Sequence, residues 1–177
     1  MSVPTPVAED EHRPGLVLAV YSWDMLLALL ALLGALAAFG GQATVGDRVV
    51  SVSVGEQVLA GISSASYAAL LIILATLLTR RHRWVRRAQL ATFAAAICLG
   101  ALSLLLEAVL PGQGVALSYV LTAALLLLLD AVAILVLTGA RIVSWYSTEG
   151  PIPTYVTATL GFWVLSSLVL VVLQALR

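Results

Sequence analysis

Long uninterrupted runs of apolar residues, separated by short polar stretches, are the dominant pattern along this chain. Five runs are long enough to cross the hydrocarbon core of a bilayer, which is about 30 Å thick and needs a helix of about 20 residues. They cover residues 16–40, 58–79, 89–110, 116–139 and 154–176. None shows the alternation of a membrane β-strand. The sequence therefore predicts an all-α, polytopic transmembrane helical bundle with five spanning helices.

Little of the chain lies outside these runs. Residues 1–15 form a polar tail, expected on the cytoplasmic side, and residues 16–177 are expected to form a single transmembrane helical domain. The first apolar run differs from a cleaved signal peptide, because it is too long, contains Asp24 and follows an acidic flank at residues 9–11. We therefore count it as a spanning helix.

Arginine is distributed unevenly between the connecting segments. A cluster of five lies between the second and third runs: Arg80, Arg81, Arg83, Arg86 and Arg87. Cytoplasmic loops carry an excess of basic residues, so this cluster is expected to anchor the chain at the cytoplasmic surface. The N-terminus is then cytoplasmic and the C-terminus external, and we expect a bacterial cytoplasmic membrane. Trp23 and Trp84 are expected in the aromatic belt at the membrane interface.

The connection at residues 41–57 carries a strand-like pattern. Val50, Val52 and Val54 alternate with Ser51 and Ser53, which is the period of an extended segment. We expect a short extended loop over the external ends of the helices. It could offer an edge to a partner strand, but a connector that covers the bundle is the interpretation we favour.

Small residues recur at helical spacing in the first three runs. The predicted helix-packing seam comprises Ala28, Ala31, Ala35 and Ala38 of the first run, in line with Asp24, and Gly61 and Ala65 of the second. A similar row in the third run comprises Ala91, Ala94, Cys98 and Ala101. Small residues let helices approach closely in lipid, so these rows, including Cys98, are expected to be buried between helices. The leucine run 125–129 is expected to face lipid or a groove on another protein.

Acidic residues inside the apolar runs are the informative polar positions. Asp24 and Asp130 each lie about nine residues from the predicted cytoplasmic surface, which places both about 13 Å below it. Ionisable groups at this depth normally face protein or water. The pair could share a proton, or bind a cation or a partner's arginine. Alternatively, each is protonated and hydrogen-bonded to a neighbouring group. Glu107 lies close to a helix end and is expected to reach the external interface.

Motifs that carry known chemistry are few. About a quarter of the residues in a soluble domain are charged, whereas 62% of this chain is apolar and 10% is charged. Zero formal net charge gives no indication of a nucleic-acid partner. Both histidines lie in polar stretches and the single cysteine precludes a cysteine metal cluster. We expect no catalytic residues, no metal and no cofactor.

Two functions are compatible with this pattern. The first is a non-enzymatic accessory or structural subunit of a larger membrane complex, for example an energy-transducing one, whose partners are the lipid bilayer and other membrane protein subunits. The second is a small transporter or channel component that uses Asp24 and Asp130. A membrane enzyme is the least favoured reading, since polar loops are short and His or Cys pairs are lacking in the sequence.

Overall fold

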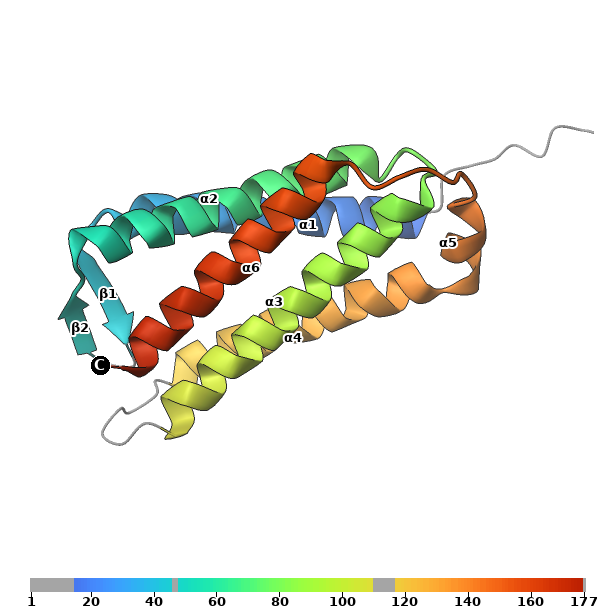
Figure 1. Cartoon of the computed structure of the whole chain (residues 1–177). Helices are drawn as coiled ribbons and strands as arrows, with labels where there is room; N and C mark the ends of the chain where they lie inside the picture. The colour runs from blue at the N-terminus through green and yellow to red at the C-terminus, as the bar shows by residue number, and fades with distance from the viewer. Residues whose placement is uncertain (1–14, 46–47, 110–116, 177) are drawn as a thin grey trace, which may run out of the picture.

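The computed structural model describes residues 15–45, 48–109 and 117–176, in which helices dominate (Figure 1). Five helices of this part are long and apolar enough to cross a membrane. They are α1 (Gly15–Ala38), α2 (Val54–Leu77), α3 (Arg83–Val109), α4 (Leu117–Thr138) and α6 (Thr154–Ala175). Even a helix of 22 residues extends about 33 Å, enough for the hydrocarbon core. The chain is a polytopic integral membrane protein with an all-α fold, as the sequence predicts.

A small β-hairpin connects α1 to α2. Strands β1 (Gln42–Val45) and β2 (Arg48–Ser51) pair antiparallel, with Gln42 opposite Ser51 and Val45 opposite Arg48. Gly41 leads into β1 with a φ of 74°, which a residue without a Cβ adopts at no steric cost. The extended segment predicted from the alternation of residues 50–54 is present, but its strand ends at Ser51 and Val54 already begins α2. Residues 46–47, between the two strands, and residues 1–14 of the polar tail lie outside the described part of the chain.

Two spanning helices begin earlier than the apolar runs. α2 starts at Val54 instead of residue 58, because Ser53 and Glu56 form a capping box in which the Glu56 side chain accepts from the Ser53 backbone N–H at 3.0 Å. α3 starts at Arg83 instead of residue 89, so most of the arginine cluster lies on its first turns. A short helix, α5 (Ala140–Trp145), occupies the connection after α4 and was not predicted.

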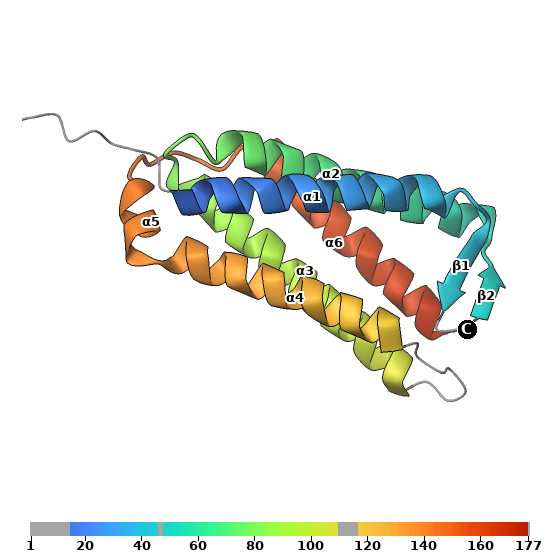
Figure 2. The same ribbon diagram turned by 180° about the vertical axis from the view of Figure 1, so that it is seen from behind.

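The bundle has two distinct ends. The arginine end contains residues 80–87 and α5, and the hairpin end contains β1 and β2 (Figure 1). α1 packs along α2, α2 along α6, and α3 along α4. Both ribbon views show α1 and α4 close together at the arginine end and well apart at the hairpin end, with α6 between them in Figure 2. The start of α1 and the end of α6 lie at opposite ends, as an odd number of spans requires.

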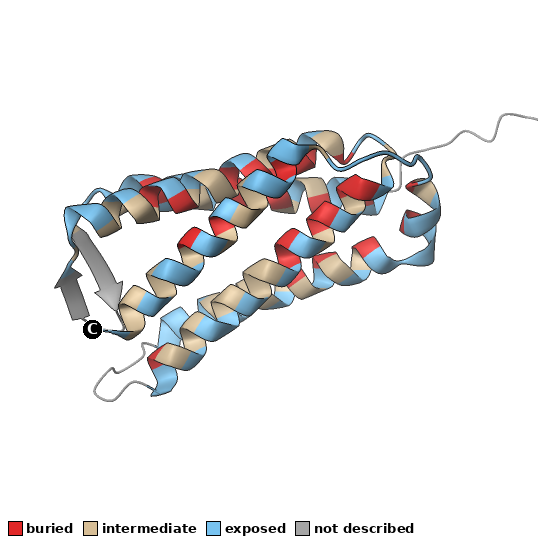
Figure 3. Cartoon of the chain, viewed as in Figure 1, coloured by how far each residue is buried: buried red, intermediate tan, exposed pale blue. Residues whose placement is uncertain are grey.

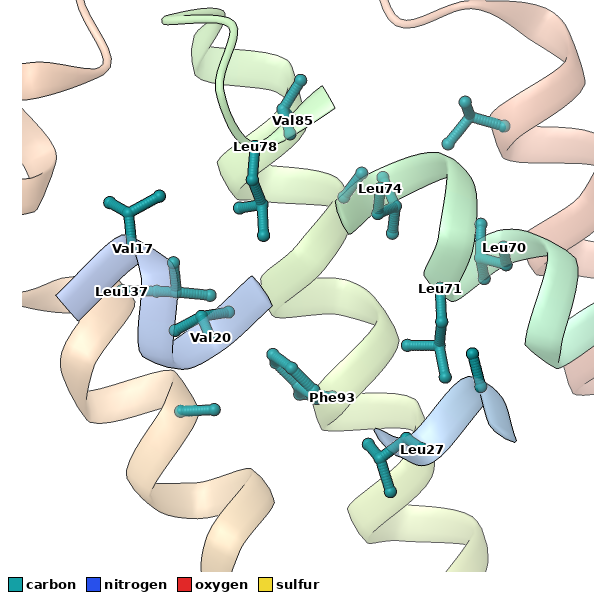
Figure 4. Packing of buried hydrophobic residues seen from close by; sticks show 14 of the residues in the cluster. Val17, Val20, Leu27, Leu70, Leu71, Leu74, Leu78, Val85, Phe93 and Leu137 are labelled. Carbon is teal, nitrogen blue, oxygen red and sulfur yellow. The ribbon is translucent and has the colours of Figure 1, made fainter. Parts of the chain in front are cut away.

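Buried residues concentrate toward the arginine end (Figure 3). Here Val17 and Val20 of α1, Leu137 of α4, and Val85 and Phe93 of α3 join one apolar cluster (Figure 4). α2 contributes four fully buried leucines to the same cluster: Leu70, Leu71, Leu74 and Leu78 at its C-cap. Large exposed side chains are frequent on the remaining surfaces, which is normal where the solvent is lipid. The packed part of the bundle therefore lies close to one membrane surface.

The row of small residues expected to be buried in α3 instead faces outward. Ala91, Ala94, Cys98 and Ala101 are all exposed. The packing face of α3 is formed by larger and polar residues, among them Gln89, Thr92 and Phe93. The prediction for Cys98 was wrong because alanine is so frequent in this chain that its spacing alone does not identify a contact face. Gly100 provides the close approach instead, since a Cβ there would lie 2.9 Å from Leu127 Cδ2.

Candidate functional site

Asp24 lies in the interior of the bundle, in the first half of α1. Its side chain is fully buried and accepts a hydrogen bond of 2.5 Å from Nε2 of Gln89, a fully buried residue of α3. Asp24 Oδ2 and Gln89 Oε1 have no hydrogen-bond partner among the described residues. The pair joins two helices that are far apart in sequence, and two of its buried oxygens have no partner within the described residues.

Asp130 lies on α4 and accepts a hydrogen bond from Trp23, the residue before Asp24 on α1. The indole Nε1 of Trp23 donates to Asp130 Oδ1 at 2.9 Å. Asp130 is 4% exposed, whereas Trp23 is half-buried, so this hydrogen bond is partly buried. The sequence placed Trp23 in the interfacial aromatic belt. The structure instead uses it to connect α1 with α4.

These four residues form one polar layer, which we define as Trp23, Asp24, Gln89 and Asp130. Asp24 follows Gly15 by nine residues and Asp130 precedes Thr138 by eight, so both lie about 12–14 Å from the arginine end. No direct bond joins the two carboxyl groups among the described contacts. Each one is held by a neutral donor from another helix.

A second group of polar side chains lies nearer the hairpin end. Ser166 Oγ donates to Ser63 Oγ at 2.9 Å, and Ser63 Oγ lies 3.1 Å from Ser167 Oγ, so hydroxyl groups connect α2 with α6. Tyr67 of α2 stacks on Trp163 of α6 with ring centroids 4.3 Å apart. Ser66 bonds within its own helix, donating to the Ser63 carbonyl at 2.7 Å, whereas the Ser63 hydroxyl is bonded across to α6.

Two hollows follow the line along which α1 faces α4. The serine cleft, about 460 Å³, lies between α1, α2, α4 and α6 and is lined by Ala31, Gly34, Ser64, Tyr67 and Trp163 among others. The indole groove, about 370 Å³, lies between α1 and α4 alone, with Trp23 and Leu26 facing Leu129 and Val132. We call the two together the α1–α4 seam. Of the polar layer, Trp23 lines the indole groove, and neither hollow is lined by Asp24, Gln89 or Asp130.

The predicted packing seam is only partly buried. Ala28 and Ala35 are buried on α1, whereas Ala31 and Ala38 are half-buried. Gly61 is buried on α2, and a Cβ there would lie 2.9 Å from the ring of Phe39. Ala65, placed on the same row from its spacing, is exposed. The small residues of α1 therefore face two surroundings: some contact α2, and Ala31 lines the serine cleft.

All five clustered arginines lie at the arginine end, but they are not equivalent. Arg83 forms an ion pair of 2.7 Å with Glu149, and Arg86 donates to the Leu137 carbonyl at 3.3 Å. Arg81 lies over the Trp145 ring, 5.5 Å from its centroid. Arg80 and Arg87 are exposed. The cluster is thus partly a set of contacts that hold the loops together, and not only a charge anchor.

Sequence reasoning missed the partners of both aspartates. Gln89 and Trp23 lie 65 and 107 residues from the side chains that they bind, so no local spacing reveals these pairs. A weak signal was present for Gln89, since it is a polar residue among apolar ones and needs a partner when it is buried. The partner of Glu107 was missed as well: this residue is buried and accepts from Gln174 Nε2 at 3.0 Å.

Known chemistry and known relatives give no further guide to the site. Within the described residues, no group of three or more His, Cys, Asp or Glu side chains could hold a metal ion. Comparison with protein-family models, with curated proteins and with solved structures gives no match. The polar layer and the α1–α4 seam are therefore the features of this chain that bear on its function.

Proposed function

We propose that this protein is a non-enzymatic accessory subunit of a larger membrane complex, and that the α1–α4 seam receives a spanning helix of a partner subunit. The observation that carries the proposal is the pair of hollows that follow one another along α1, the indole groove at Ala19–Leu26 and the serine cleft at Leu27–Gly34. α1 and α4 are bridged by the Trp23–Asp130 bond and diverge toward the hairpin end.

The dimensions of the seam favour an elongated occupant. Its lining residues on α1 run from Ala19 to Gly34, which is about 22 Å along the helix axis. That length is a large part of the hydrocarbon core of about 30 Å. An occupant that follows the seam must therefore run roughly along the membrane normal, as a spanning helix does.

The chemistry of the seam suits a protein helix. Helix association in lipid depends on close packing, on small residues that permit it and on hydrogen bonds from hydroxyl groups. The seam contains small residues on both sides, including Ala19, Gly34 and Ala133, and the Ser64 hydroxyl lies in the serine cleft. Leu26 and Leu30 form an exposed apolar rim. Such a surface can bury a second helix without leaving a polar group unpaired.

The polar layer supports a structural role. Its two carboxyl groups, one amide and one indole are engaged in bonds between helices, and these bonds fix how α1, α3 and α4 lie relative to one another. A layer of this kind sets the width of the seam. We propose that its purpose is to hold the docking surface in shape.

Site-specific photo-crosslinking in the intact membrane tests the proposal. A benzophenone amino acid at Leu26 or Leu30, on the rim of the seam, is expected to give a protein adduct, whereas Leu165, equally apolar and exposed on α6 outside the seam, is not. Mass spectrometry should place the crosslinked peptide in a spanning segment of another membrane protein. Adducts to lipid alone, adducts to a second copy of this chain, or equal yields from Leu165 would contradict the proposal.

A second candidate function is a small transporter or channel component. It is favoured by the two unpartnered oxygens, Asp24 Oδ2 and Gln89 Oε1, because buried acceptors of this kind can take a proton or a cation. Proteoliposome flux assays separate the two candidates. If Asp24→Asn and Asp130→Asn both fold and assemble normally but abolish coupled flux, the transporter is correct and the accessory subunit is not.

A further inference from the structure

We infer that the arginine end contains a binding site for the phosphate of an anionic phospholipid headgroup, formed by Arg83 and Arg87 at the start of α3. These residues line a pocket of about 400 Å³ together with Trp84, Glu149, Gly150 and Ile152. The inference is independent of the proposed partner helix, because the pocket lies at the membrane surface and shares no lining residue with the seam.

The two arginines converge because of helix geometry. They are four residues apart on α3, a spacing that places side chains on the same face about one turn from each other. Arginine donates through a planar fork that matches phosphate oxygens. The pocket also lies at the N-terminal end of a helix of 27 residues, where the backbone dipole favours negative charge. Three independent features thus favour an anion at the same place.

The wall of the pocket opposite α3, formed by residues that follow α5, is held in position by backbone hydrogen bonds. The Arg83 N–H donates to the Thr148 carbonyl at 2.9 Å, and the Thr148 N–H donates to the Arg81 carbonyl at 3.0 Å. Tyr146 adds a side-chain bond from its hydroxyl to the Leu78 carbonyl at 3.1 Å. These contacts press residues 146–150 against the start of α3. The pocket is therefore a built cavity between two segments and not an open patch of arginine side chains.

The pocket is lined by two arginines and only one acidic residue, so its positive charge is not fully compensated. Arg83 is paired with Glu149 at 2.7 Å, and the Glu149 side chain is 80% exposed. An exposed ion pair of this kind contributes little stability. Arg87 has no ion pair or hydrogen bond within the described part of the chain, and it lines the same pocket. A phosphate can thus bind Arg87 directly and compete with Glu149 for Arg83.

The apolar neighbours favour a lipid over a free anion. Trp84 is almost fully buried beneath the pocket and Ile152 is 41% exposed at its edge. A headgroup phosphate arrives with glycerol and acyl carbons attached, and these apolar groups gain contacts that inorganic phosphate lacks. Basic pockets between helices at the membrane surface recognise lipid headgroups through this combination.

Titration calorimetry on the full-length protein in neutral detergent tests the inference. Dioctanoyl-phosphatidylglycerol should bind, while dioctanoyl-phosphatidylcholine and sodium phosphate should bind at least tenfold more weakly. Arg87→Gln should weaken phosphatidylglycerol binding by about fivefold, the effect of removing one surface cation. Glu149→Gln should strengthen it, because it frees Arg83 and removes a competing negative charge. Arg141→Gln removes the same charge from α5, outside the pocket, and should leave the affinity unchanged.

Three results would overturn the inference. Equal losses from Arg141→Gln and Arg87→Gln would mean diffuse attraction to all arginines. Phosphate binding as tight as phosphatidylglycerol binding would mean a site for free anions. Weaker binding by Glu149→Gln would mean that the ion pair builds the pocket and does not compete with the ligand. Size-exclusion chromatography of each variant confirms that a lost signal is not a lost fold.

Discussion

The indole of Trp23 donates to the carboxylate of Asp130 at 2.9 Å and thereby connects α1 with α4. Few other contacts join these helices. Asp24, the next residue, is bound by Gln89 of α3. Two consecutive residues of α1 therefore tie it to both helices of the α3–α4 pair, and the arrangement at the arginine end depends on side-chain hydrogen bonds as well as on apolar packing.

Replacing Trp23 by Phe should destabilise the protein by about 1–3 kcal/mol, because the nearly buried Asp130 loses its donor while most of the ring volume remains. Unfolding in mixed micelles with increasing SDS measures the change. Trp145→Phe is the matched control, since Trp145 Nε1 has no hydrogen-bond partner within the described residues. Equal destabilisation by both substitutions would show that the Trp23 hydrogen bond contributes nothing.

The Asp24–Gln89 pair should behave as a unit. Asp24→Asn keeps a group that accepts from Gln89 and is expected to be tolerated, whereas Asp24→Leu leaves the Gln89 amide unpaired and should cost about 1–3 kcal/mol. Adding Gln89→Leu should recover most of that loss, because both polar partners are then removed. The same unfolding assay gives the coupling energy. Additive effects of the two leucine substitutions would show that the residues act independently.

Overpacking distinguishes buried from lipid-facing alanines. Ala28→Leu introduces three carbons at a position that is 2% exposed and should cost about 1–3 kcal/mol. Ala94→Leu makes the same change on the exposed face of α3 and is expected to stay within about 0.5 kcal/mol. Comparable losses would mean that the face of α3 containing Ala94 is also packed against protein.

Membrane orientation remains a prediction from the arginine distribution. Single cysteines at residues 5 and 176, introduced into a Cys98→Ala background, should react with a membrane-impermeant maleimide from opposite sides. Position 5 is expected to be reached only from the cytoplasm. Labelling of both positions from the same side would contradict five spans, and a reversed pattern would contradict the predicted orientation alone.

Hydrophobic runs predicted the number of spanning helices because length and apolar character are properties of each segment by itself. The start of α2 was placed at residue 58 from its apolar run, whereas the capping-box pattern of Ser53 and Glu56 in the sequence marks the true start at Val54. Which helices pack against one another could not be predicted in this way. The depth of Asp24 and Asp130 could be counted along their helices, but their partners depend on which helices pack together. The row of small residues on α3 that includes Cys98 was predicted to be buried but is exposed, because small residues occur both on faces that contact other helices and on faces that contact lipid.

The spacing of the Asp24–Gln89 bond has a consequence for biosynthesis. At a translation rate of about 5–20 residues per second, the 65 residues between the partners take about 3–13 s to synthesise. Throughout that interval α1 has emerged from the ribosome with an acid that has no partner, and such a group costs at least about 2.5 kcal/mol at mid-membrane. Asp130 is synthesised later still, 107 residues after Trp23. The first helix is therefore expected to stay beside the insertion machinery until α3 arrives, so that the order of release into the bilayer differs from the order of synthesis.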